Sequence, residues 1–196
     1  MNLFWKITAA ALAGAALGLG LTSVAVTRGF SFDEVKAGPW QGMPQVPASG
    51  GDPYARATIS RSGQAPLGGA EGLGFTATRD SSGAKLVASC DYRVAGAMPS
   101  ARFWTLTVTD ARGHLVAAPD GAPSLRAGFT SSEIVRNAGG GFEIRAAREA
   151  RAGNWLPLAM PGTFMLALRL YDSPHSLSAG ALTAAEMPEI TRERCS

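Results

Sequence analysis

The chain has 196 residues, enough for one domain of ordinary size plus a terminal segment and too few for two well-packed cores. Hydrophobic residues make up 46% of the chain and charged residues 17%, and the formal net charge is only +3. Because the basic residues are scattered singly among acidic ones, the sequence predicts no nucleic-acid partner.

An uncharged apolar segment occupies residues 7–26 (ITAAALAGAALGLGLTSVAV). About 20 such residues in a helix are needed to cross a hydrocarbon layer of ~30 Å. Lys6 precedes the segment, and this slight positive bias directs the N-terminus toward the cytoplasm. We therefore predict a cytoplasmic N-terminus at residues 1–6 and a transmembrane anchor at residues 7–26. The remaining chain would lie in the periplasm, as the C-terminal domain of a single-pass inner-membrane protein.

The sequence does not decide whether the apolar segment is cleaved or whether it pairs with a second copy. A cleaved signal peptide is the alternative to a retained anchor, because Ser23 and Ala25 are small residues at the spacing that a signal peptidase recognises. We favour the anchor, since the usual apolar core of a signal peptide is only about 7–15 residues long. Gly14 and Gly18 form a G-x-x-x-G through which two helices could pair into a homo-oligomer, although the abundance of Ala and Gly also explains this spacing by chance.

Residues 27–52 are rich in Gly, Pro and small polar residues without a sustained period. This composition predicts an extended linker, followed by a folded domain at residues 53–196. Residues 54–60 fit either a short helix or an entry strand, and the sequence does not decide between them. Residues 67–74 hold too many glycines for a helix interior, so we expect a turn there.

Alternation of apolar and polar residues predicts β-strands along the rest of the chain. Residues 75–78 lead through a turn at 79–83 into a return strand at 85–94, which predicts a hairpin. Further strands are expected at residues 102–110, from residue 142 onward, and at 163–171, where regular alternation favours a strand over a helix. The residues predicted to point inward are Leu86, Ala88, Cys90, Tyr92, Val94, Trp104, Leu106, Val108, Phe142, Ile144, Ala146, Phe164, Leu166, Leu168 and Leu170.

These elements predict an all-β fold, an antiparallel jelly-roll-like β-sandwich with one N-terminal transmembrane helix. A short helix is expected at residues 183–186, before Pro188.

Two cysteines, Cys90 and Cys195, lie far apart, without a C-x-x-C motif or a histidine at metal-ligand spacing. In an oxidising periplasm they could form a disulfide that fastens the C-terminal tail to the strand around Cys90, worth up to ~4–5 kcal/mol. The alternative is a buried Cys90 and a loose Cys195. His114 and His175 lie in turn-like contexts without neighbouring ligands, so the sequence predicts no metal site and no cofactor.

Six strings carry a family resemblance, in order from residue 52 to the C-terminus: DPYARA (52–57), PLGGAEGLGF (66–75), ARFWTLTVTD (101–110), GNWLPL (153–158), FMLALRLYDSP (164–174) and MPEITRERCS (187–196). Together they resemble domain-of-unknown-function family 1214 (DUF1214), the frequent companion of family 1254 (DUF1254). The resemblance implies an antiparallel jelly-roll sandwich in a short membrane-anchored protein, with an anchored DUF1254-like protein as a partner. It supports the tether between Cys195 and Cys90. It implies no mechanism, because the family has no assigned function.

Some large polar and aromatic residues stand where the alternation would prefer simple ones. We take them as candidate ligand-binding residues: Arg102, Asn154, Trp155, Arg169 and Tyr171. The hypothesis is a polar patch at one mouth of the sandwich, in which Arg169 binds an anionic group and Trp155 or Tyr171 forms a stacking wall.

The same residues have a structural explanation, which we favour. Arg169 would pair with Asp91 or Glu71, and Asn154 with Trp155 would lock a loop onto the sheet. No G-x-S-x-G or H-E-x-x-H motif is present, so catalytic residues cannot be named. The sequence favours a membrane-anchored periplasmic envelope protein that works as a binding or assembly module with a DUF1254-like partner. The alternative is a hydrolase-type enzyme acting on an amphipathic or anionic substrate in a pocket at the sandwich mouth.

Overall fold

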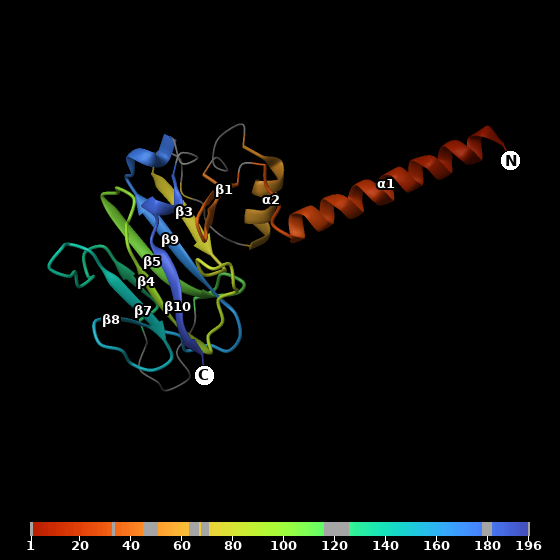
Figure 1. Cartoon of the computed structure of the whole chain (residues 1–196). Helices are drawn as coiled ribbons and strands as arrows, with labels where there is room; N and C mark the ends of the chain where they lie inside the picture. Colours follow the sequence, from red (N-terminus) through yellow and green to blue (C-terminus); the bar gives the residue numbers. More distant parts are fainter. Residues whose placement is uncertain are drawn as a thin grey trace.

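The computed structural model of the chain describes residues 2–32, 34–44, 51–62, 67, 71–115, 126–177 and 182–195. It is a mainly β structure with two sheets and an apolar helix, α1 (Leu3–Thr27), that extends away from the rest of the chain (Figure 1). None of the residues of α1 is buried, and the helix is long and apolar enough to cross a membrane by length and composition. The predicted helix is confirmed, whereas its insertion in a membrane stays a prediction.

The strands form a larger sheet of six strands and a smaller sheet of four. The larger sheet consists, in spatial order, of β1 (Val35–Ala37), β2 (Trp40–Gly42), β3 (Gly72–Ala77), β9 (Phe164–Tyr171), β5 (Phe103–Asp110) and β6 (Gly128–Thr130). The smaller sheet consists of β10 (Glu189–Cys195), β4 (Cys90–Ala95), β7 (Glu143–Ala147) and β8 (Asn154–Pro157).

The two sheets share one apolar core. The strands β5 and β9 bury alternate residues, as predicted, and their register places Leu106 opposite Leu168. Across the core, the ring of Tyr92 in β4 meets the ring of Phe164 in β9 edge to face, with 5.5 Å between centroids. All the residues predicted to point inward are buried in one cluster, so the two-residue period located the core correctly.

The predicted hairpin is wrong beyond its turn. Asp80 and Ala84 close a tight turn, and Arg79 pairs with Lys85 in an isolated bridge. The two strands then separate, because β3 pairs with β2 and β9 in the larger sheet while β4 pairs with β10 and β7 in the smaller one. The chain therefore crosses from one sheet to the other where a simple return was expected.

The predicted linker at residues 27–52 contributes to the fold. Its strands β1 and β2 form a hairpin that joins the larger sheet through β3. Trp40 is fully buried, and its Nε1 donates a hydrogen bond to the carbonyl oxygen of Pro188 at 2.7 Å. A single buried tryptophan anchors this segment to the C-terminal part of the chain, a contact that the local composition does not indicate.

The undecided segment after the linker is helix α2 (Pro53–Ser62), which lies beside the end of α1 (Figure 1). Proline at the first helical position is favourable, and the side chain of Asp52 accepts a hydrogen bond from the N–H of Tyr54 at 2.9 Å. The predicted short helix near residue 183 is the 3-10 helix η3 (Ala184–Glu186), closed by a capping box between Thr183 and Glu186.

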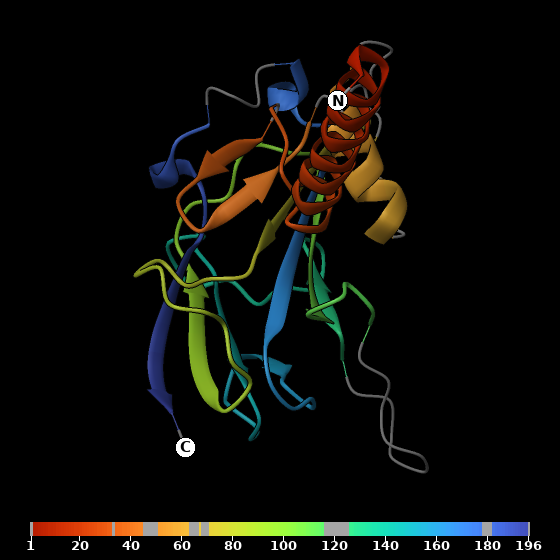
Figure 2. The same cartoon turned by 90° about the vertical axis from the view of Figure 1, so that its right-hand side faces the viewer.

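Besides β1 and β2 in the predicted linker, three further strands were not predicted: β6, β8 and β10. The strand β8 pairs with β7 in parallel, so the smaller sheet departs from the purely antiparallel arrangement that was expected. The strand β10 forms the edge of the smaller sheet and ends at the side of the domain away from α1 (Figure 2).

Candidate functional site

Arg169 lies on the outer face of the larger sheet, in its strand β9. The register places Gly74 of β3 and Thr105 of β5 on either side of it. Gly74 has no side chain, and a Cβ atom at this position would find nothing within 4 Å, so the surface beside Arg169 is open. Arg169 is exposed and makes no ion pair within the described residues, so the predicted pairs with Asp91 and Glu71 are both absent.

Two aromatic side chains border Arg169 on this face. Tyr171 lies two residues along β9, and its ring contacts that of Phe103 in β5 at 5.8 Å between centroids. Arg102 precedes β5, donates its backbone N–H to the carbonyl oxygen of Tyr171 at 3.1 Å, and forms an exposed ion pair with Asp172 at 3.7 Å. The structure therefore brings together three of the five candidate residues. We name this group the Arg169 patch, which consists of Arg169, Tyr171, Phe103 and Arg102.

Phe103 was not among the sequence candidates. It alternates with Trp104, whose burial in the core obliges Phe103 to face outward. A partly exposed aromatic on the polar side of a strand was the signal that could have identified it.

Asn154 and Trp155 lie in β8 of the smaller sheet, and no contact within the described residues joins them to the Arg169 patch. The Asn154 side chain is buried, donates to the carbonyl oxygens of Val135 and Glu143, and accepts from the N–H of Val135, each at 2.8 Å. The Nε1 of Trp155 donates to the carbonyl oxygen of Ala147 at 3.0 Å. These contacts agree with the structural explanation, in which both side chains hold a loop against the sheet.

We expect replacement of Asn154 by alanine to lower the free energy of unfolding by about 2–3 kcal/mol, because it removes three hydrogen bonds of a buried side chain and leaves backbone groups of Val135 and Glu143 without these partners. Urea unfolding followed by tryptophan fluorescence measures this change. The exposed Arg102, replaced by alanine, is the control and should stay within about 0.5 kcal/mol of the parent chain. Equal stabilities of the two variants would contradict the structural role of Asn154.

Glu143 is a carboxylate with a perturbed pKa that the fold itself explains. Side-chain hydrogen bonds from Arg93 at 2.7 Å and Arg145 at 2.8 Å hold the pKa of Glu143 below its ordinary value, against a smaller opposing effect of burial. The three residues lie on neighbouring strands β4 and β7. Such a cross-strand cluster stabilises a sheet and needs no catalytic explanation. No group of His, Cys, Asp or Glu within the described residues could hold a metal ion.

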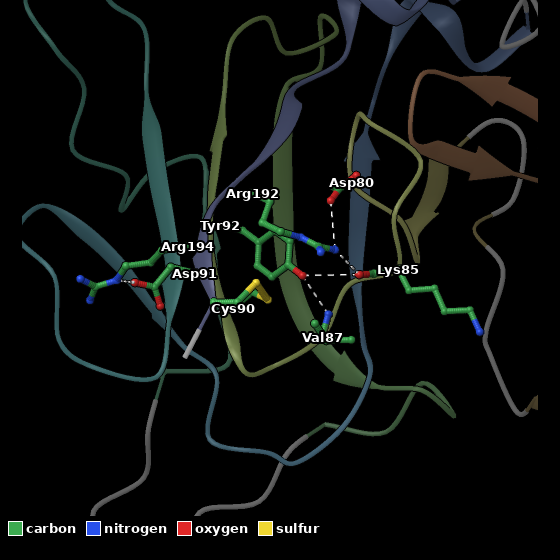
Figure 3. Close-up of a disulfide and its surroundings, with 9 residues drawn as sticks. Asp80, Lys85, Val87, Cys90, Asp91, Tyr92, Arg192 and Arg194 are labelled. Atoms are coloured by element: carbon green, nitrogen blue, oxygen red, sulfur yellow. Dashed lines mark hydrogen bonds and ion pairs between the residues drawn. A yellow bond between two sulfur atoms is a disulfide. The ribbon is translucent and has the colours of Figure 1, made fainter.

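The C-terminal strand is fastened covalently to the sheet. Cys195 and Cys90 are opposite one another in the pairing of β10 with β4, and a disulfide joins them (Figure 3). Cys195 is exposed whereas Cys90 is part of the core. Arg194 adds an ion pair to Asp91 at 2.8 Å, and Arg151 contacts the same carboxylate at 2.7 Å. The predicted disulfide is present, and Asp91 has other partners than Arg169.

Arg192 of β10 contacts three groups at the edge of the core. Its guanidinium lies over the ring of Tyr92 at 5.5 Å, donates to the carbonyl oxygen of Lys85 at 2.6 Å, and pairs with Asp80 at 3.2 Å (Figure 3). Asp80 is almost fully buried, and its Oδ1 accepts from the N–H and hydroxyl groups of Ser82 and from the N–H of Ala84. Burial raises the pKa of Asp80, but these hydrogen bonds and the charge of Arg192 outweigh it, so the pKa is lowered.

Two solved structures share features with this chain. The VPA0106 protein from Vibrio parahaemolyticus is 23% identical with a TM-score of 0.54, over 72% of this chain and 35% of that one. An uncharacterised protein from Burkholderia cenocepacia is 21% identical with a TM-score of 0.41, over 64% of this chain and 30% of that one. The chain thus spans about a third of the length of these proteins, and the likeness to the Vibrio protein concerns the fold alone.

No curated protein matches the chain. The family DUF1214, described as a protein of unknown function, matches residues 71–175. This range begins just before β3 and ends just after β9, so it contains the whole Arg169 patch. The resemblance found in the sequence is confirmed over more than half of the chain, and the chain belongs to the DUF1214 family.

Proposed function

We propose that the chain is a periplasmic envelope protein, held in the bacterial inner membrane by α1, that serves as a binding or assembly module. The observation that carries this proposal is the combination of an apolar helix of 25 residues with a disulfide between Cys90 and Cys195. Disulfides persist in oxidising compartments such as the periplasm and are rare in the cytosol. The length of α1 favours a retained anchor over a cleaved signal peptide.

The Arg169 patch is the surface that we assign to a partner. Arginine and aromatic side chains dominate the binding energy of protein interfaces, and here Arg169, which makes no ion pair with any described residue, lies beside two aromatic rings. The neighbouring Gly74 has no side chain and leaves the sheet surface open on one side of Arg169. An acidic group of the partner would pair with Arg169 without first breaking another ion pair.

An anchored DUF1254-like protein is the partner that the family resemblance implies. Pairing of two copies through Gly14 and Gly18 is a second contact in keeping with the proposal, since a Cβ atom at either glycine would meet nothing within 4 Å in the single chain. We also propose that the two sheets form a jelly-roll sandwich, from which the parallel β7–β8 pair is a local departure.

Replacing Arg169 with alanine is expected to reduce recovery of a membrane partner at least about tenfold, which corresponds to ~1.4 kcal/mol of binding free energy. The experiment is a pull-down of the tagged full chain after detergent extraction from its native membrane, with quantification of the co-purified protein. The stability of the variant should change by less than about 0.5 kcal/mol, because no ion pair is lost.

Arg112 provides the matched control for this experiment. It is exposed at the turn after β5 and lies outside the Arg169 patch, so Arg112→Ala removes the same charge elsewhere. The proposal holds if the parent chain and Arg112→Ala recover one stoichiometric membrane partner and Arg169→Ala does not. It fails if the parent chain recovers none, and equal recovery by both variants removes Arg169 from the interface.

The enzyme alternative has less support from the described residues. A hydrolase needs converging acid, base or nucleophilic groups, yet the candidate residues divide between the two sheets. The lowered pKa values of Asp80 and Glu143 are explained by contacts that hold strands and turns in place.

A further inference from the structure

An open pocket of about 480 Å³ lies where α1 meets the larger sheet. One of its walls is apolar and comes from the last turns of α1, through Leu21, Val24 and Ala25. The pocket is therefore continuous with the apolar surface of the helix. If α1 spans a bilayer, this wall faces the acyl chains of the outer half of the membrane.

Charged residues also line the pocket. Arg28 directly follows α1, is exposed, and makes no ion pair within the described residues. Lys36 of β1 pairs with Glu34 at 3.3 Å, and both line the pocket. Two cations and one carboxylate leave a net positive charge, carried by Arg28, that suits a phosphate group.

A cluster of three aromatic residues, two of them exposed, lies at the same junction. The rings of Phe30, Phe32 and Tyr54 contact one another edge to face, at 4.9, 6.1 and 6.0 Å between centroids. Phe30 is 47% exposed and Phe32 74% exposed, which is costly for a surface in water and favourable in the headgroup region of a membrane. The buried Asp52 holds the cluster together, because its carboxylate accepts the N–H groups of both Phe32 and Tyr54. This cluster indicates independently that the junction lies at a membrane surface.

The dimensions of the junction match those of a lipid. Leu21 and Arg28 are seven residues apart in the sequence, which is about 10 Å along a helix axis at 1.5 Å per residue. This distance leads from the acyl region to the headgroup region of one leaflet.

We propose that the pocket binds one anionic phospholipid from the surrounding bilayer. Its phosphate would contact Arg28 and Lys36, while its glycerol and upper acyl chains would lie against Leu21, Val24 and Ala25. The inference rests on the proposed membrane insertion of α1. The site would fix the orientation of the domain relative to the membrane surface, and thereby of the Arg169 patch.

The test is a titration of the detergent-solubilised full chain with phosphatidylglycerol, with bound lipid counted by native mass spectrometry. The parent chain should retain one phosphatidylglycerol per chain, and Arg28→Gln should weaken this binding at least about tenfold, as expected for loss of a charge-assisted contact to phosphate. Arg112→Gln carries the same charge change away from the pocket and should bind like the parent chain. Phosphatidylcholine should bind more weakly than phosphatidylglycerol to the parent chain.

Flotation of the full chain with phosphatidylglycerol vesicles tests the membrane anchor separately from the lipid site. A chain that does not float contradicts the membrane anchor itself. If the chain floats but Arg28→Gln binds phosphatidylglycerol as tightly as the parent chain does, the lipid site is overturned and the anchor stands. The same conclusion follows if the parent chain binds phosphatidylglycerol and phosphatidylcholine equally well. Displacement of the lipid by an equal concentration of glycerol 3-phosphate would show a site for soluble phosphate, and a lipid-free dimer occupying the pocket would also overturn the inference.

Discussion

Replacing Cys195 with serine is expected to lower the free energy of unfolding by about 4–5 kcal/mol. The disulfide closes a loop with a sequence separation of 105 residues, and in the chain-entropy model a loop of about 100 residues is worth ~4.7 kcal/mol. Cys195 is the position to change, because it is exposed at the edge of the sheet and Cys90 keeps its packing in the core. Urea unfolding of the detergent-solubilised chain, followed by tryptophan fluorescence, measures the loss.

The reduced parent chain is the matched control for this variant. With a thiol reductant present, the parent chain and Cys195→Ser should unfold at the same urea concentration, since neither contains the cross-link. Without reductant, the parent chain should be the more stable by the full difference. Coinciding curves under both conditions would contradict a stabilising disulfide.

Replacing Asp80 with alanine is expected to lower the free energy of unfolding by about 3 kcal/mol. The change removes the acceptor of three hydrogen bonds in the turn at residues 80–84 and leaves Arg192 without its carboxylate. The same turn contacts β10, because Ser81 and Ile190 exchange two hydrogen bonds. The loss should therefore loosen the C-terminal strand, and hydrogen exchange at the backbone of Ile190 should become faster. Asp172→Asn, which removes the charge of an exposed ion pair and suits the positive φ of this residue, should change stability by less than about 0.5 kcal/mol.

Asp80 also predicts a dependence of stability on pH. Its pKa in the folded chain lies below the ordinary value of 3.8, so its contribution is fully present above that value and is lost as the pH falls through the lowered pKa. Asp80→Asn removes this titration. We expect its stability to decline less steeply below pH 3.8 than that of the parent chain, and parallel declines would contradict the assignment.

The sequence by itself determined the features that depend on short-range patterns. The uncharged run at residues 7–26 is long enough to mark α1 without any knowledge of the rest of the chain. The two-residue period at residues 102–110 and 163–171 identified β5 and β9 and the inward side of each strand. The family followed from six short strings, and the family match confirms it.

Only the tertiary structure decided which strands pair and which polar residues meet. The turn at Asp80 looks locally like the turn of a hairpin, but the strands on either side join different sheets, because each buries its apolar face with strands distant in sequence. The strand β10 carries one buried residue, Ile190, in a polar stretch, and it is joined to β4 by a disulfide and an ion pair that no local period indicates. Arg169 is exposed rather than paired with Asp91, because it lies on the outer face of the larger sheet, whereas Asp91 lies in the smaller sheet and pairs with Arg151 and Arg194. These outcomes depend on contacts between residues far apart in the chain, which a local pattern does not contain.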